Sequence, residues 1–212
     1  MDIQDCLTQY REKITHFEKD TKAIFDEIKK EAENVKVEYW RTQKETSVCF
    51  ILSCPGRLEL ISDKLCAGTT GDNLDKLLGF LNLKAKNIFP YQSRYDYHLA
   101  NASKQVHYKE LTDDSTLKCK EIKKYSNDLK QFIKNNGIKI CICCGNDARK
   151  SIEYIESELT DVTIVNICHI GSLGLHATYP NKTNEELDDE TRLQYLAEEI
   201  IEQYSEKKEI LK

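Results

Sequence analysis

Two polar side chains end apolar segments of the chain, where they could act on a ligand. Asn101 ends the extended segment 95–101, and its amide offers one donor and one acceptor, which suits bidentate pairing with a nucleobase edge. His169 follows the apolar run 162–168 and could stabilise an anion or donate to a leaving group. Each has a plainer alternative, because asparagine is common in turns and a lone histidine is often simply buried and hydrogen-bonded.

Two loops have the composition of a ligand cradle. The first, Ser53-Cys54-Pro55-Gly56, combines a proline that lacks a backbone donor with a glycine that permits a sharp reversal. The second, Gly68-Thr69-Thr70-Gly71-Asp72, precedes leucines at helical spacing, with Thr70 or Asp72 as a candidate cap. Free N–H groups and a helix start favour phosphates and flat polar heterocycles, whereas the plainer alternative is a pair of ordinary turns.

The cysteines suggest a third kind of chemistry. Cys141, Cys143 and Cys144 lie in one apolar run, but alternate strand residues face opposite sides, and no second cysteine pair stands at zinc spacing. We therefore expect no metal, no other cofactor and no disulfide. A nucleophilic Cys54 beside His169 stays open as an alternative, since a thiol next to a histidine is the usual activated arrangement.

The elements that must position these residues alternate along the chain. Short apolar runs predict strands over residues 48–52, 138–144 and 162–168, and the segment 95–101 supplies a fourth. Helical periodicity predicts the intervening and final helices, over residues 74–81, 117–136, 146–159 and 184–206. This alternation predicts a four-stranded parallel sheet covered on both faces, with ligands bound at the carboxyl ends of its strands.

Composition limits the function classes. The 212 residues carry a net charge of −5, so bulk charge gives no reason for non-specific nucleic-acid binding, and any DNA contact needs a local basic patch. No apolar run approaches the length of a membrane span, and the polar N-terminus does not read as a signal peptide, so we expect a cytoplasmic, reduced protein with no membrane partner. Residues 2–36 predict one long amphipathic helix, which could pack on the domain or bind a protein partner or second copy.

The motifs form an ordered set. The chain contains Ser53-Cys54-Pro55-Gly56-x-x-Glu59, then Gly68-x-x-Gly71-x-x-Leu74, a strand ending in Asn101, Cys144-Gly145-x-x-Ala148, and His169-x-Gly171. Over residues 47–180 this set resembles the uracil-DNA glycosylase superfamily, and most of all its microbial branches with a P-G-x-x-E first motif. The resemblance implies a three-layer α/β/α domain over residues 46–212, preceded by a helical extension at residues 1–45.

The resemblance also implies roles for single residues. Asn101 would recognise the flipped base, Pro55 and Gly56 would line its cradle, and His169 would stabilise the base as it leaves as an anion. Cys66 stands near the position of the aromatic that stacks on the base in many members. Contacts to the DNA backbone are expected from the residues of two further motifs, namely Gly68, Thr69, Thr70, Gly171 and Ser172.

The first motif departs from the family pattern. Its water-activating positions carry Ser53 and Cys54, neither a strong base, so Glu59 is the candidate for the missing carboxylate or else a brace for the loop. We expect a DNA glycosylase of base-excision repair that cleaves uracil or another modified pyrimidine. The alternative is a non-catalytic module that binds a base, a nucleotide or a protein in the same cradle, and the Ser53-Cys54 pair favours it.

Overall fold

The computed structural model describes residues 36–62, 64–107, 117–181 and 186–210. The long helix expected over residues 2–36 falls outside this part of the chain except for Lys36, which forms an isolated bridge with Gln105. Residues 36–212 form one compact unit.

A four-stranded parallel sheet forms the centre of this unit, as the sequence predicts. The strands are β1 (Val48–Leu52), β2 (His98–Asn101), β3 (Ile140–Cys144) and β4 (Thr163–Ile167). Their order across the sheet is β2-β1-β3-β4, and every neighbouring pair is parallel. All four strands therefore end at the same edge, and the loops that follow them gather there.

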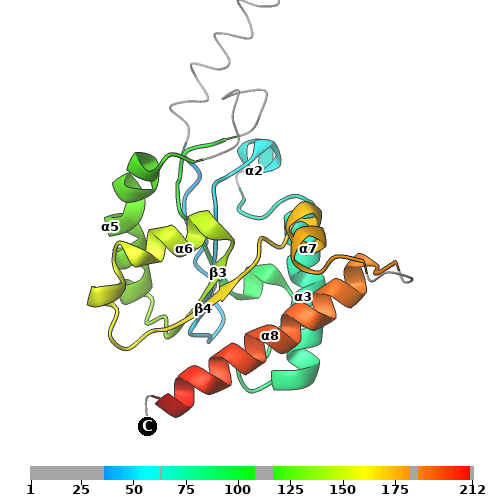
Figure 1. Ribbon diagram of the computed structural model, residues 1–212. Coiled ribbons are helices and arrows are strands. Elements are labelled where there is room, and N and C mark those ends of the chain that lie inside the picture. The colour runs from blue at the N-terminus through cyan, green and yellow to red at the C-terminus, as the bar shows by residue number, and fades with distance from the viewer. Residues whose placement is uncertain (1–35, 63, 108–116, 182–185, 211–212) are drawn as a thin grey trace, which may run out of the picture. The chain divides into compact units, whose positions relative to one another are not determined.

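Helices cover both faces of the sheet and give the expected three layers (Figure 1). One face carries α5 (Cys119–Asn135) and α6 (Asn146–Glu153), and the other carries α3 (Thr69–Ala85) and α8 (Asp189–Ile210). The short helices α2 (Arg57–Ser62) and α7 (Ser172–Thr178) follow β1 and β4, while η1 (Arg94–Asp96) and η2 (Glu156–Glu158) are single 3-10 turns.

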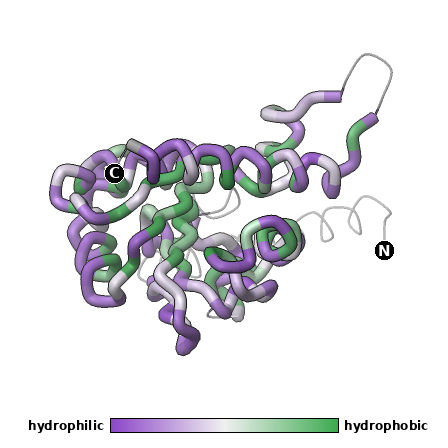
Figure 2. Tube along the Cα trace, turned by 90° about the horizontal axis from the view of Figure 1, so that it is seen from below, coloured by the Kyte–Doolittle hydropathy of each residue, from purple (hydrophilic) through white to green (hydrophobic). Residues whose placement is uncertain are grey.

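Apolar side chains from the strands and inner helix faces make the core. Figure 2 shows hydrophobic stretches in the middle of the domain and hydrophilic ones mostly along its outside. On the α5/α6 face, Cys49, Ile51 and Ala100 pack with the strand cysteines Cys141 and Cys143. The buried α3 leucines follow the spacing that predicts that helix: Leu74, Leu77, Leu78 and Leu81. Reduced cysteine acts in this core as a small hydrophobe.

The helix boundaries differ from the sequence expectation in physically simple ways. Helix α3 begins at Thr69 with Gly68 as its N-cap and has no side-chain cap, so neither Thr70 nor Asp72 fills that role. Helix α2 was not expected because it has no buried residue and hence no apolar periodicity. Helix α8 begins at Asp189, and the expected start at residue 184 lies among the undescribed residues.

Both outer edges of the sheet are covered. Trp40 exchanges two backbone hydrogen bonds with Leu99 of β2, at 2.9 and 3.0 Å. At the other edge, the Gln203 side chain of α8 accepts from the Asn166 backbone N–H (3.2 Å) and donates to the Asn166 carbonyl (2.9 Å). Lys207 donates to the Ile164 carbonyl of the same strand.

Within the described part of the chain, every helix is too short or too polar to cross a membrane.

Candidate functional site

The loops after β1 and β2 run side by side at the carboxyl edge of the sheet. The carbonyls of Leu52, Ser53 and Pro55 accept backbone hydrogen bonds from Ala102, Ser103 and His107, at 2.8 to 3.0 Å. These bonds continue the parallel ladder past the strand ends and hold the Ser53–Gly56 turn against the segment after Asn101.

Asn101 is the last residue of β2 and is paired in register with Leu52. Its side chain is almost fully buried, with 2% of the residue exposed. Its amide makes no hydrogen bond with any other described residue, although a buried amide normally has a partner. The Asn101 amide is therefore free to pair with a ligand, which suits the predicted base contact better than a turn role.

His169 lies two residues beyond β4 and is exposed, although the backbone at Gly145 and Gly171 approaches it closely. Its Nδ1 accepts a hydrogen bond from the Gly171 N–H at 3.0 Å. A Cβ atom at Gly171 would lie 2.9 Å from that nitrogen, so the close approach of the loop to the ring requires glycine there. Desolvation of the ring lowers the pKa of His169, and the Asp147 carboxylate partly offsets this effect.

The His169 loop is fixed to the second glycine loop. The Asn73 side chain of α3 donates to the Ile170 carbonyl at 2.9 Å, and Asn73 is buried. Space is tight between the two loops, because a Cβ atom at Gly171 would also lie 3.5 Å from the Thr70 hydroxyl. The predicted backbone-contact residues Thr70 and Gly171 thus lie together, beside His169. Asn73 is a positioning residue that the motif spacing did not reveal.

The carboxylate of Asp147, which the sequence analysis did not single out, also lies at the carboxyl edge of the sheet. Asp147, the second residue of α6, accepts a hydrogen bond at 2.7 Å from the Ser53 hydroxyl. The two residues are 94 positions apart in the chain and meet because β1 and β3 are neighbouring strands. The sequence position of Asp147 could have indicated this role. An acidic residue just after a strand and a glycine turn is expected in the first turn of a helix, at the edge of the sheet where ligands bind.

Glu59, the sequence candidate for that carboxylate, acts within its own loop. Its side chain accepts from the Gly56 backbone N–H at 3.0 Å, and the Leu60 N–H returns to the Gly56 carbonyl at 3.1 Å. This is the arrangement of an acidic third residue that caps the start of a helix, here α2. The geometry favours the brace over the catalytic role for Glu59.

Cys54 is a poor candidate nucleophile. Its thiol packs against the small cluster of Ala102, Leu117 and Ile122. Burial, with the nearby Asp147 and other carboxylates, raises the pKa of Cys54 to about 11, although a contact with the Ser53 hydroxyl acts in the opposite direction. The reactive thiolate is therefore scarce at neutral pH.

No group of three metal-ligating side chains occurs among the described residues.

Cys66 stands in a strained turn before α3. Its backbone has a φ of 59°, in the left-handed region that non-glycine residues rarely adopt. A Cβ atom at Gly71 would lie only 1.8 Å from the Cys66 carbonyl oxygen, so this glycine permits the turn to close over the helix start. Cys66 is itself buried, and burial raises the pKa of its thiol to about 12. Cys66 is therefore a small, buried apolar side chain in this turn.

Two neighbouring residues at the start of α7 have different environments. The Ser172 hydroxyl donates to Asp189 at 3.1 Å and is therefore already engaged within the protein. Leu173, in contrast, is 91% exposed, the highest exposure among the large apolar residues described. Sequence reasoning did not single out Leu173, because its exposure follows from the tertiary position of α7 rather than from its spacing.

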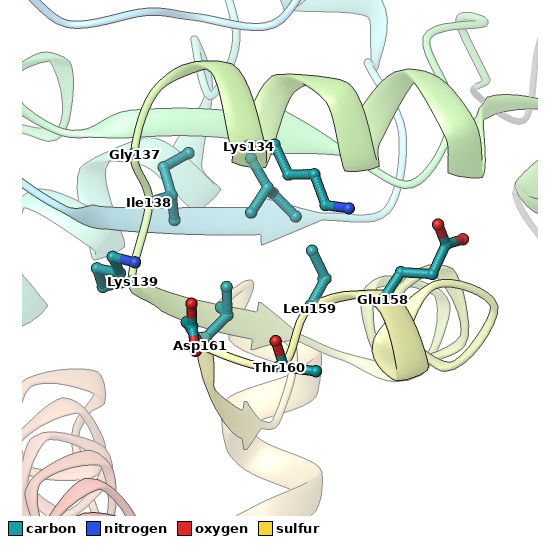
Figure 3. A pocket seen from close by; sticks show the side chains of 10 residues that line it. Lys134, Gly137, Ile138, Lys139, Glu158, Leu159, Thr160 and Asp161 are labelled. Atoms are coloured by element: carbon teal, nitrogen blue, oxygen red, sulfur yellow. The ribbon is translucent and has the colours of Figure 1, made fainter.

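One cavity opens at the candidate edge and another at the opposite edge. The first, of about 420 Å³, is lined by His169, Gly145 and Asn146 together with residues of β4 and α7. Figure 3 shows the second, of about 270 Å³, which lies beside the amino ends of β3 and β4 and is lined by Lys134, Lys139 and neighbouring residues. Of the residues predicted to act on a ligand, His169 alone lines the first cavity, and none lines the second.

Comparison of the chain with protein-family models and with curated proteins gives no match.

Proposed function

We propose that this chain is a DNA glycosylase that cleaves the N-glycosidic bond of uracil or another modified pyrimidine, acting on a base flipped out of the DNA. Such a reaction needs an extruded base, recognition of its edge, and stabilisation of the negative charge that develops on the base as it leaves. The carboxyl edge of the sheet offers a candidate for each.

The state of His169 carries this proposal. Because Nδ1 accepts from the Gly171 N–H, the proton of the neutral ring belongs on Nε2. The lowered pKa keeps the ring neutral near pH 7. A neutral imidazole of fixed tautomer is a directional hydrogen-bond donor, suited to the oxygen of a departing pyrimidine anion without itself losing a proton.

The spacing of the sheet supports a nucleobase as the ligand. Asn101 and His169 follow the two outer strands, with β1 and β3 between them. Three strand spacings separate the ends of β2 and β4 by about 14 Å, since neighbouring strands lie about 4.8 Å apart. That distance accommodates a pyrimidine ring with a side chain reaching it from each side, the unpartnered Asn101 amide on one and His169 on the other.

Leu173 supports engagement of DNA in particular. With 91% of its surface exposed, Leu173 contributes little to the core of the folded protein. Proteins that distort DNA often insert such an apolar wedge between base steps, and the cost of unstacking is offset by the contacts that follow. On this proposal Leu173, four residues after His169, would fill the space that a flipped base leaves.

The test is a cleavage screen over single- and double-stranded oligonucleotides that carry uracil or modified pyrimidines. We expect His169→Ala to lose about 100-fold to 1,000-fold in rate, the usual effect of removing one anion-stabilising donor, while still binding abasic product. Asn101→Ala should instead weaken discrimination among bases, because it removes the edge contact and leaves the anion stabiliser in place.

His176→Ala is the matched control, since His176 is exposed on α7 and pairs with Asp189 at 2.7 Å. It should retain wild-type activity. If the wild-type protein leaves every oligonucleotide intact but binds a base, nucleotide or protein, and Asn101→Ala abolishes that binding, the enzyme proposal fails in favour of a binding module.

A further inference from the structure

We infer that Asp147, held by the Ser53 hydroxyl, positions and deprotonates the attacking water; this assignment rests on the proposed glycosylase function. Two roles, shaping the first loop and activating the water, then belong to two different acidic residues. Glu59 shapes the loop, and Asp147 supplies the carboxylate from a different strand end.

The hydrogen bond between Ser53 and Asp147 fixes the orientation of the carboxylate. Ser53 donates to Oδ2 at 2.7 Å, and within the described residues no protein group binds the other oxygen, Oδ1. One oxygen is thus anchored while the other can accept a hydrogen bond from water. Both residues are only partly exposed, so the pair is partly shielded from solvent.

Asp147 lies close enough to His169 for the two residues to act in one reaction, Asp147 on the attacking water and His169 on the leaving base. Its charge acts on the His169 ring, and both residues lie beside Gly145, at the ends of the neighbouring strands β3 and β4. A carboxylate close to the anion stabiliser, yet anchored separately on β1, can face the sugar while His169 faces the base. Its negative charge would also stabilise an oxocarbenium-like sugar.

Glu59 also has one anchored oxygen, since its Oε2 accepts the Gly56 N–H that starts α2, but it lies within the loop that it braces. The Cys54 thiol, with a pKa of about 11, cannot act as the base near neutral pH. Asp147 differs in its place, because it lies two residues after Gly145, where an added Cβ atom would lie 3.3 Å from the Cβ of His169.

The step balances as a hydrolysis. The bond between C1′ and the base nitrogen breaks, and its electron pair leaves with the base, whose anion accepts a hydrogen bond from His169. The water oxygen forms a bond to C1′ and gives one proton to Asp147. Asp147 then releases that proton to solvent, and the base anion takes a proton from solvent, so the products are the neutral base and an abasic sugar.

The experiment measures single-turnover cleavage as a function of pH for the wild type and four variants, with binding to abasic-site DNA as the measure of intact folding. Asp147→Asn should lose about 100-fold to 10,000-fold in rate, the range for a general base, and should lose the rise of rate with pH that the wild type shows. Ser53→Ala should lose less and keep that rise, because the carboxylate is present but less well oriented.

Glu153→Gln is the matched control, an exposed acid at the end of the same helix α6, and should behave as the wild type. Glu59→Gln should lower the thermal midpoint but keep the pH dependence. Unchanged rate and pH dependence in Asp147→Asn, or loss of the pH rise in Glu59→Gln instead, would overturn the assignment alone. A wild type that cleaves none of the oligonucleotides would overturn the glycosylase proposal, and this assignment with it.

Discussion

At the scale of single residues, the surroundings of the His169 ring shift its pKa in two opposite directions. Desolvation lowers the pKa below its ordinary value near 6.5, and Asp147 acts in the opposite direction. Asp147→Asn removes the charge that favours the imidazolium, so the pKa of His169 should fall further. NMR titration of the imidazole carbon-bound protons measures both values.

The same shift has a consequence for stability. Because His169 takes up its proton at higher pH in the unfolded chain, the folded state loses stability as the pH falls from about 6.5 through the folded-state pKa. His169→Asn should reduce this loss of folding stability at acidic pH. A titration that places the His169 pKa above 7 would show that the ring is mostly charged at neutral pH, which would contradict its role as a neutral donor.

Gly71 offers the sharpest residue-scale test of the fold. A Cβ atom there would overlap the Cys66 carbonyl, so Gly71→Ala should lower the free energy of unfolding by about 2–3 kcal/mol, the usual cost of overpacking. Gly79→Ala in the same helix is the control, because a Cβ atom at Gly79 meets nothing within 4 Å. It should raise that free energy by about 0.5–1 kcal/mol through helix propensity. Urea unfolding of both variants gives the comparison, and equal effects would contradict the strained turn.

At the scale of elements, α8 does more than cover a face of the sheet. Gln203 satisfies both the N–H and the C=O of Asn166 on the outer edge of β4. Gln203→Leu keeps the apolar part of the side chain but leaves these two backbone groups without their partner. The free energy of unfolding should fall by about 1–2 kcal/mol, as measured by chemical denaturation.

The exposed Glu202, adjacent to Gln203 in the same helix, provides the control. Glu202→Gln should leave the free energy of unfolding within about 0.5 kcal/mol of the wild type, as surface changes usually do. If Gln203→Leu is equally neutral, the contacts to Asn166 contribute nothing to stability and water satisfies the strand edge.

At the scale of the whole molecule, the sheet could be predicted because its signals are local. The apolar runs at Val48–Leu52 and Ile140–Cys144 are long enough to mark buried strands, and the polar residues after them mark the ligand edge. Since parallel strands end at a common edge, the placement of Asn101 and His169 followed from strand ends alone.

The remaining features depend on contacts between distant parts of the chain. The pairing of Ser53 with Asp147 needs the order of the strands, which periodicity does not give. Assigning Glu59 to the loop needed the Gly56 hydrogen bond, and the exposure of Leu173 needed the orientation of α7. These are tertiary facts, and one sequence contains no direct signal for them.

The covered edges of the sheet also bear on how the chain is made. Trp40 precedes the sheet in the sequence. It can therefore pair with the outer edge of β2 as soon as β2 leaves the ribosome. The outer edge of β4 instead waits for Gln203 and Lys207, which are synthesised about 40 residues later. During that interval the nascent protein presents a bare apolar strand, open to pairing with other chains. Chaperones that bind extended apolar segments should therefore hold the chain longest between synthesis of β4 and docking of α8.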